Sequence, residues 1–148
     1  VWHPGRRLLW GGYGFRSDPE VFEQVAEAFK TPVILLKLVN ERFYHLDTCF
    51  CPLTPESVLI YPSAFDAASL ELILKIFPVV VTANEADAVG KMACNAAVVR
   101  SRTAVIQQGA SASIGHMRAL GLEVVEVDTS EYIKSGGSVY CMKQFLFA

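Results

Sequence analysis

The stretch SVLIYPSAFDAASLELILKIFPVVVTA, residues 57–83, places a helix-like segment between two apolar runs. SVLIYP (57–62) and VVVTA (79–83) are short and rich in apolar residues, which favours buried strands. FDAASLELILKIF (65–77) is predicted to be a helix, with Asp66 as its N-cap because a carboxylate there accepts backbone N–H bonds. A strand, a capped helix and a second strand in this order predict an α/β unit.

Similar units flank this one. The predicted helices begin near residues 18, 66 and 112, so the units repeat about every 47 residues. The second and third units have the order strand, strand, helix, strand, which predicts stacked supersecondary units within one domain, residues 1–148. A Rossmann fold is the competing architecture, but no G-x-G-x-x-G motif follows a predicted strand. The other predicted strands are 7–14, 32–39, 43–53, 95–100, 103–108, 122–128 and 139–147, and the other helices are 17–30 and 111–121.

Caps and turns set the expected ends of these elements. Ser17 or Asp18 is expected to cap the first helix, and Gly121 is expected to end the third. The strands 95–100 and 103–108 are predicted to pair as a hairpin joined at Ser101 and Arg102.

Composition limits the classes of protein that fit. The chain is 52% hydrophobic and 19% charged with a net charge of −2, which argues against disorder and against a nucleic-acid-binding surface. The longest apolar runs are too short to cross a bilayer. Four cysteines without a dense disulfide pattern indicate a reduced, cytoplasmic protein. The first residue is Val1 and not Met, which suggests that the sequence is a piece of a longer protein.

FYHLDTCFCPL, residues 43–53, carries chemically active side chains at alternate positions. If this run is a strand, an imidazole, a carboxylate and two thiols share one of its faces: His45, Asp47, Cys49 and Cys51. An imidazole can move protons near neutral pH, and a carboxylate can hold a cation through charge-assisted hydrogen bonds. Cys49, Cys51 and Cys94 are expected to be packing residues, and His3 and His116 solvent or cap residues.

The Gly-rich turn KSGGS, residues 134–138, is the second candidate region. Gly136 and Gly137 allow a ligand to approach the backbone closely. Cys141 follows on a predicted strand, where a thiolate of lowered pKa would be a nucleophile, with His45 as proton carrier. Alternatives remain open: Cys141 as a buried packing residue, His45 as a structural residue, or a zinc site that begins with His45, Cys49 and Cys51, although the spacing is not of the C-x₂-C type.

HLDTCF (45–50) together with KSGGSVYCM (134–142) resembles the guanidine-group-modifying superfamily, the penteins. That superfamily includes arginine deiminases, dimethylarginine dimethylaminohydrolases and glycine amidinotransferases. The resemblance covers nearly the whole chain in the expected order of elements. It implies an α/β-propeller of five ββαβ modules, of which this chain would hold nearly three as a partial propeller.

The resemblance also implies roles for single residues. Cys141 would attack a guanidinium carbon to form an amidino-thioether, and His45 would act as general acid and base. Asp47 would hold guanidinium nitrogens, as in deiminases and amidinotransferases rather than dimethylarginine hydrolases. Arg16, in GYGFRS, would bind the substrate carboxylate. The Gly-rich turn would line the substrate site, and no metal or cofactor is implied.

Two functions of different classes therefore follow as expectations. The first is a cysteine-dependent enzyme, hydrolase or amidinotransferase, acting on the guanidine group of arginine or a derivative. The second is a catalytically silent partial α/β domain that acts in assembly or ligand binding. The family's acidic guanidinium-binding motif, of the E-G-x-x-D kind, would lie before Val1. A partial propeller would expose sheet edges, so self-association as a dimer is expected.

Overall fold

The computed structural model describes residues 1–144 of the chain. Its strands are β1 (Leu9–Tyr13), β2 (Val33–Lys37), β3 (Phe50–Pro52), β4 (Ser57–Ile60), β5 (Val79–Thr82), β6 (Ala97–Val99), β7 (Thr103–Gln107) and β8 (Glu123–Val127). Its α-helices are α1 (Val21–Phe29), α2 (Ala67–Ile76), α3 (Glu85–Gly90), α4 (Ser111–Ala119) and α5 (Ser130–Ile133). Its 3₁₀-helices are η1 (Glu41–Phe43), η2 (Leu46–Thr48), η3 (Pro62–Ala64), η4 (Ala93–Asn95) and η5 (Tyr140–Met142).

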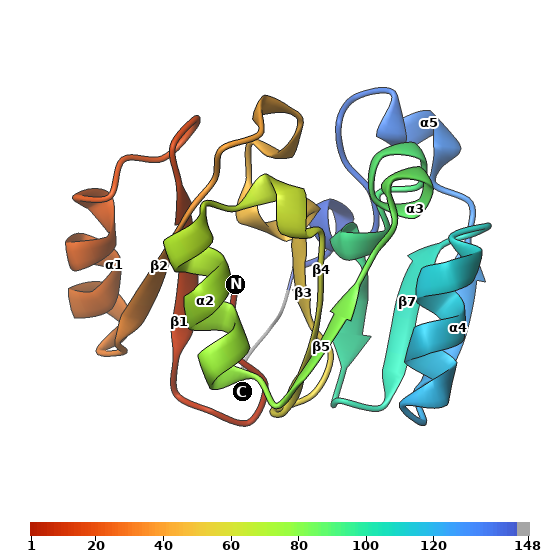
Figure 1. The fold of residues 1–148 in the computed structure, drawn as a ribbon, viewed down its shortest axis with the longest axis horizontal. Helices are drawn as coiled ribbons and strands as arrows, with labels where there is room; N and C mark the ends of the chain where they lie inside the picture. Colours follow the sequence, from red (N-terminus) through yellow and green to blue (C-terminus); the bar gives the residue numbers. More distant parts are fainter. Residues whose placement is uncertain (145–148) are drawn as a thin grey trace.

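The strands form three small sheets, β1-β2, β3-β4-β5 and β6-β7-β8. The sheets follow one another across the molecule, with α1 at one end and α4 at the other (Figure 1). In the second and third sheets the first two strands are antiparallel and the last two are parallel. The parallel pairs are joined through α2 and α4, since parallel strands need a crossover connection. The predicted α/β class is confirmed.

The first unit is a reduced version of the other two. Its strands β1 and β2 are parallel and are connected through α1. A single antiparallel bridge between Trp2 and Leu9 stands where the other units have a full first strand. All three units therefore run in the same order along the chain, as the repeat of helix starts predicts.

The predicted strand 43–53 is wrong over most of its length. Only β3 is a strand, and the chain makes η1 and η2 before it. The carbonyl of His45 accepts bonds from both the backbone N–H and the hydroxyl of Thr48, at 3.1 and 2.6 Å, which closes a tight turn. Asp47 lies inside that turn, so the alternating face expected for this run does not exist.

The predicted strand 139–147 is also wrong in its described part. Residues Tyr140–Met142 form η5, and residues 145–148 lie outside the described residues. The Lys143 and Met142 amides bond back to carbonyls three or four residues earlier, which coils this segment. Cys141 is therefore presented by a short helix and not by a strand.

Local signals account for some of the helix ends. Asp66 caps α2, because its carboxylate accepts a bond of 2.8 Å from the Ser69 N–H. Gly121 ends the α4 turn with φ of +83°, which suits glycine. The first cap is wrong: α1 begins at Val21 after Glu20, with no side-chain cap bond, because Asp18 belongs to a preceding turn.

The predicted hairpin of β6 and β7 is confirmed, with Val99 opposite Thr103. Three residues, 100–102, connect the two strands, one more than the predicted pair Ser101 and Arg102, and Arg100 and Ser101 have positive φ, at 52° and 51°. The short helices α3 and α5 follow no predicted pattern, although Asn84 caps α3 by accepting from the Asp87 N–H at 2.8 Å.

Aromatic rings join the first and second units. Trp10 of β1 lies 5.1 Å from Phe50 and 5.4 Å from Phe77 between ring centroids, and all three side chains are buried. His3 is buried among them, so its expected place in solvent is wrong. Its Nδ1 accepts from Trp10 Nε1 at 3.1 Å, its Nε2 lies 2.9 Å from the Pro55 carbonyl, and its ring stacks on Phe77. Across residues 1–144 no helix is long and apolar enough to span a membrane.

Candidate active site

Asp47 and Cys141 meet in space although 94 residues separate them in sequence. The Cys141 thiol donates a hydrogen bond of 3.2 Å to Asp47 Oδ2. The turn of η2 presents the carboxylate and the turn of η5 presents the thiol, and η5 lies between the second and third sheets (Figure 1). Two of the candidate residues therefore form a direct thiol–carboxylate pair.

Asn95 completes this pair from a third element. Its Nδ2 lies 3.0 Å from Asp47 Oδ2 and 3.2 Å from Cys141 Sγ. Its Oδ1 accepts from the backbone N–H groups of Ser138 and Cys141 at 3.0 and 3.4 Å. Asn95 is fully buried at the end of η4, whereas Cys141 is exposed. One buried amide therefore touches the carboxylate, the thiol and the backbone that carries the thiol.

Sequence reasoning missed Asn95. The available signal was an amide within an otherwise apolar run, ACNAAVV (93–99), since buried amides need specific partners. That signal marks a satisfied polar residue but does not identify its partners, which lie 46 and 48 positions away.

The Gly-rich turn is held to the site by Tyr44. The Tyr44 hydroxyl donates to the Gly136 carbonyl at 2.9 Å. Gly136 has φ of +84°, and a Cβ added there would collide with the same hydroxyl. A Cβ at Gly137 would lie 3.1 Å from the Cys141 Cβ. Both glycines thus allow a close packing of the turn that presents Cys141.

His45 and Arg16 gather around Tyr44 and not around the thiol. The His45 ring meets the Tyr44 ring edge-on, with centroids 5.0 Å apart, and the Arg16 guanidinium lies 5.1 Å from the Tyr44 ring centroid. Both side chains are exposed. Among residues 1–144 no hydrogen bond or ring contact joins His45 to Cys141. The structure therefore unites Asp47 with Cys141, and His45 with Arg16 through Tyr44.

The surroundings of Cys141 raise the pKa of its thiol. Desolvation of the partly covered thiol is the largest cause, and the negative charge of Asp47 and its hydrogen bond with the thiol act in the same direction. Hydrogen bonds from the Ser138 backbone and the Asn95 side chain lower it in part. The direction of this shift is opposite to the lowered pKa that a neighbouring imidazolium would give.

The other cysteines pack in the interior, as predicted. Cys49, Cys51 and Cys94 are buried, and burial raises the pKa of each, to about 12 for Cys51. The Cys51 thiol donates to the Ala96 carbonyl at 3.4 Å. In the part of the chain that the structure describes, no three His, Cys, Asp or Glu side chains are arranged to hold a metal ion.

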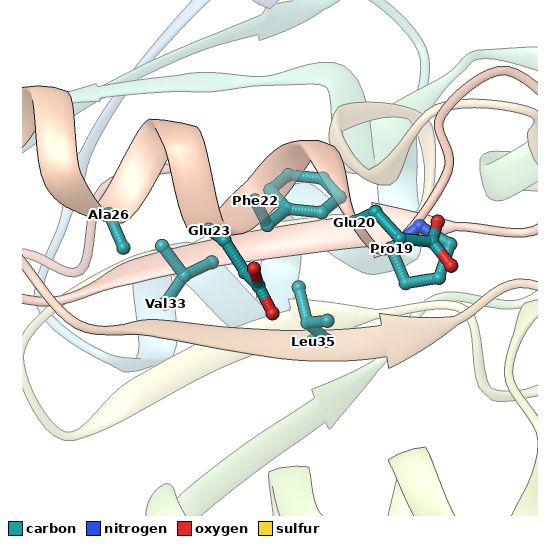
Figure 2. Close-up of a pocket in the computed structure, with 7 residues that line it drawn as sticks. All are labelled: Pro19, Glu20, Phe22, Glu23, Ala26, Val33 and Leu35. Atoms are coloured by element: carbon teal, nitrogen blue, oxygen red, sulfur yellow. The ribbon is translucent and has the colours of Figure 1, made fainter.

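A groove between α1 and β2 lies apart from the thiol–carboxylate pair. Much of its lining is formed by Phe22, Val33 and Leu35, with Glu23 on α1 and Glu20 immediately before that helix (Figure 2). None of the candidate site residues lines it.

Comparison with known proteins gives several extensive similarities, although no protein-family model matches the chain. The bifunctional arginine dihydrolase/ornithine cyclodeaminase AgrE of Nostoc sp. is 40% identical over 138 residues, which are 92% of this chain and 19% of AgrE. The N(G),N(G)-dimethylarginine dimethylaminohydrolase of Mycobacterium tuberculosis is 39% identical over 137 residues, which are 93% of this chain and 44% of that protein.

Comparison with solved structures also finds similarity to enzymes that act on arginine. The N-terminal domain of ArgZ, a cyanobacterial arginine dihydrolase bound to its product, has a TM-score of 0.85 and 39% identity over 91% of this chain and 50% of that chain. The amidinotransferase SxtG of Microseira wollei shares the fold, with a TM-score of 0.77 at 16% identity over 91% of this chain and 43% of that chain. The chain spans about half, or less, of the length of the curated relatives that it matches.

Proposed function

Because this chain is homologous to part of the guanidine-group-modifying (pentein) superfamily, we propose that it belongs to a cysteine-dependent enzyme acting on the guanidine group of arginine or an arginine derivative. The observation that carries the proposal is the hydrogen bond of 3.2 Å between Cys141 Sγ and Asp47 Oδ2. A nucleophile and a cation-binding carboxylate in contact are what attack on a guanidinium carbon requires.

The raised thiol pKa fits such a reaction. Desolvation and the charge of Asp47 both raise the pKa of the thiol, because a thiolate beside a carboxylate is unfavourable. A guanidinium bound to Asp47 would offset that negative charge and stabilise the thiolate in its place. Cys141 would then become nucleophilic when a cationic substrate is bound, and no permanently charged imidazolium would be needed beside it.

In the proposed reaction the thiol proton leaves to solvent and the Cys141 sulfur forms a bond to the guanidinium carbon. A carbon–nitrogen bond of the guanidine breaks, the departing amine takes up a proton, and an amidino-thioether remains. Water then adds to the same carbon, the carbon–sulfur bond breaks, and a ureido product and the free thiol result. An amine in place of water would make the enzyme an amidinotransferase. A structure of the ArgZ N-terminal domain with a covalently bound reaction intermediate supports a covalent route.

The remaining candidate residues take supporting roles in this proposal. His45 is the proposed donor of the proton to the departing amine, because an imidazole can carry a proton near neutral pH. Arg16, beside the Tyr44 ring, is the proposed partner of the substrate carboxylate. Gly136 and Gly137 would let the substrate pass close to the turn. The contacts of Tyr44 support a site that includes both His45 and the turn.

Substrate choice is the finer part of the proposal. The relatives are described as arginine dihydrolases and as a dimethylarginine dimethylaminohydrolase. We favour unsubstituted arginine, because Asp47 can pair with two guanidinium N–H groups that methylation would remove or obstruct. The chain should be incubated with arginine and with mono- and dimethylated arginines, and the ureido product and released amine measured, with Cys141→Ser as the blank.

Ureido product that disappears in Cys141→Ser would support the proposal. Absence of product in both, together with equal rates of labelling of Cys141 by cationic and neutral electrophiles, would contradict it. The second candidate, a catalytically silent domain for assembly or ligand binding, is favoured by one observation, the raised pKa of the Cys141 thiol. It predicts arginine binding or self-association without covalent capture at Cys141.

We also propose that the three units are nearly three modules of a propeller and that two copies associate to cover their open edges. β2, β5 and β8 each have one hydrogen-bonded neighbour in their sheets, which leaves an edge on each. The apolar lining of the groove between α1 and β2 supports a covered surface at one of these edges (Figure 2). Sedimentation equilibrium tests this: a monomer at all concentrations would contradict the dimer.

A further inference from the structure

We propose that Asn95 is a positioning residue for the thiol–carboxylate pair, because its side-chain amide holds the turn that carries Cys141 against Asp47. The catalytic meaning of this inference rests on the proposed function. The geometry that it concerns is present in the free protein and can be tested without substrate.

The two ends of the amide have separate tasks. Oδ1 accepts the backbone N–H groups of Ser138 and Cys141, at 3.0 and 3.4 Å, and so holds the main chain of the turn. Nδ2 donates to the Asp47 carboxylate and backbone carbonyl, both at 3.0 Å, and lies 3.2 Å from Cys141 Sγ. The reverse orientation would aim Nδ2 at two N–H donors and Oδ1 at a carboxylate. The contacts therefore allow one orientation of Asn95.

A chain of hydrogen bonds between buried polar groups connects Asn95 to β7. Ser138, whose N–H bonds Asn95, has its hydroxyl 2.7 Å from the hydroxyl of Thr129. Thr129 in turn donates to Gln107 Oε1 of β7 through both its backbone N–H and its hydroxyl, each at 2.5 Å. All of these side chains are buried, where an unmade hydrogen bond is costly. The network thus ties the position of Cys141 to the third sheet.

Asn95→Asp separates the two tasks, because it preserves the shape of the side chain. One carboxylate oxygen can still accept the two backbone N–H groups. The other oxygen replaces a donor and faces the Asp47 carboxylate and the Cys141 thiol. A negative charge this close disfavours the thiolate, so we expect the pKa of Cys141 to rise by about one unit or more. Tyr140 and Lys143, which also interact electrostatically with this thiol, are unchanged in the variant.

The test is the rate of alkylation of Cys141 by iodoacetamide as a function of pH, followed by mass spectrometry. The other three cysteines are buried, and Cys141→Ser supplies the blank. Well below the thiol pKa we expect alkylation of Asn95→Asp to be about tenfold slower than that of the wild type. Asn84→Asp is the matched control, since it adds the same charge at the α3 cap, where a carboxylate is also favoured. A shift in Asn95→Asp no larger than that in Asn84→Asp would overturn the proposal.

A second measurement uses the unaltered chain and stands even if Asn95→Asp fails to fold. The side-chain amide resonances of Asn95 are followed by NMR through the titration of Cys141. We expect them to move with the midpoint of the thiol, and to lose that transition in Cys141→Ser, while those of Asn84 stay constant. An Asn95 amide that does not respond would refute the inference. Failure of guanidine turnover would count against the proposed function alone, because neither readout uses a guanidine.

Discussion

Asp47→Asn is expected to make Cys141 more reactive toward a neutral alkylating reagent and less selective for a cationic one. The thiol donates to the Asp47 carboxylate at 3.2 Å, and after burial the charge of Asp47 is the largest cause of the raised thiol pKa. The substitution removes that charge while it keeps the size of the side chain and an oxygen that can accept a hydrogen bond. A thiol freed from the neighbouring charge ionises more readily.

The size of the effect follows from the geometry. Two unit charges about 4 Å apart interact by about 1 kcal/mol in water and about 4 kcal/mol at an effective dielectric constant near 20. Cys141 is exposed, so solvent screening favours the lower value. Since about 1.4 kcal/mol corresponds to one pKa unit, the thiol pKa should fall by about one unit in Asp47→Asn. A neutral reagent should then react about tenfold faster at a pH below the thiol pKa.

Two reagents of nearly the same shape make the assay specific. Chloroacetamide is neutral and chloroacetamidine is cationic, and both alkylate a thiolate with loss of chloride. The ratio of their rates at Cys141, measured by mass spectrometry, should be high in the wild type because Asp47 attracts the amidinium. The ratio should fall in Asp47→Asn and stay unchanged in Asp18→Asn, a control at an exposed aspartate. An unchanged thiol pKa, or equal acceleration of both reagents, would refute the reasoning.

Three further predictions concern stability, each measured by urea unfolding. Gly136→Ala should lower the free energy of unfolding by about 1–2 kcal/mol, because φ is +84° and the new Cβ meets the Tyr44 hydroxyl; Gly115→Ala, with open space around it, should not. Above about pH 9 the free energy of unfolding should fall by about 1.4 kcal/mol per pH unit for each buried thiol, because the thiols of the unfolded chain lose their protons first. For Cys51 this fall should continue up to its pKa of about 12. Cys51→Ala should reduce the slope of the free energy of unfolding against pH. In acid, stability should fall as the pH drops through about 6.5, because burial lowers the pKa of His3 and the unfolded imidazole binds the proton first; a profile for His3→Gln that matches the wild type would contradict this.

Local chemistry explains what sequence could predict of the fold. The helix of residues 65–77 was predicted from an apolar run after a capping carboxylate, and Asp66 caps α2 in the structure. The hairpin of β6 and β7 and the glycine end of α4 were likewise predicted from adjacent residues. Such signals act over a few positions, so they do not depend on how distant parts of the chain pack.

The candidate site was less predictable because its local structure contradicted the pattern. Alternation in FYHLDTCFCPL favoured a strand, but the bonds of Thr48 to the His45 carbonyl fold it into a turn. Asp47 and Cys141 were predicted as candidates from their residue types, and the family resemblance then implied their roles, so both candidates were found despite the incorrect strand assignments. Their roles remain predictions, whereas their contact is a feature of the structure.

By itself, the sequence determined the α/β class, the repeat of strand, strand, helix, strand and the candidate thiol and carboxylate. Only the tertiary structure decided that Asp47 and Cys141 touch, that His45 turns toward Tyr44, and that Asn95 joins the pair. The physical reason is the range of the interactions. Periodicity and capping depend on neighbours within a few residues, whereas the hydrogen bonds of Asn95 reach 46 and 48 positions along the chain and exist only when the second unit, the third unit and the final turn are packed together.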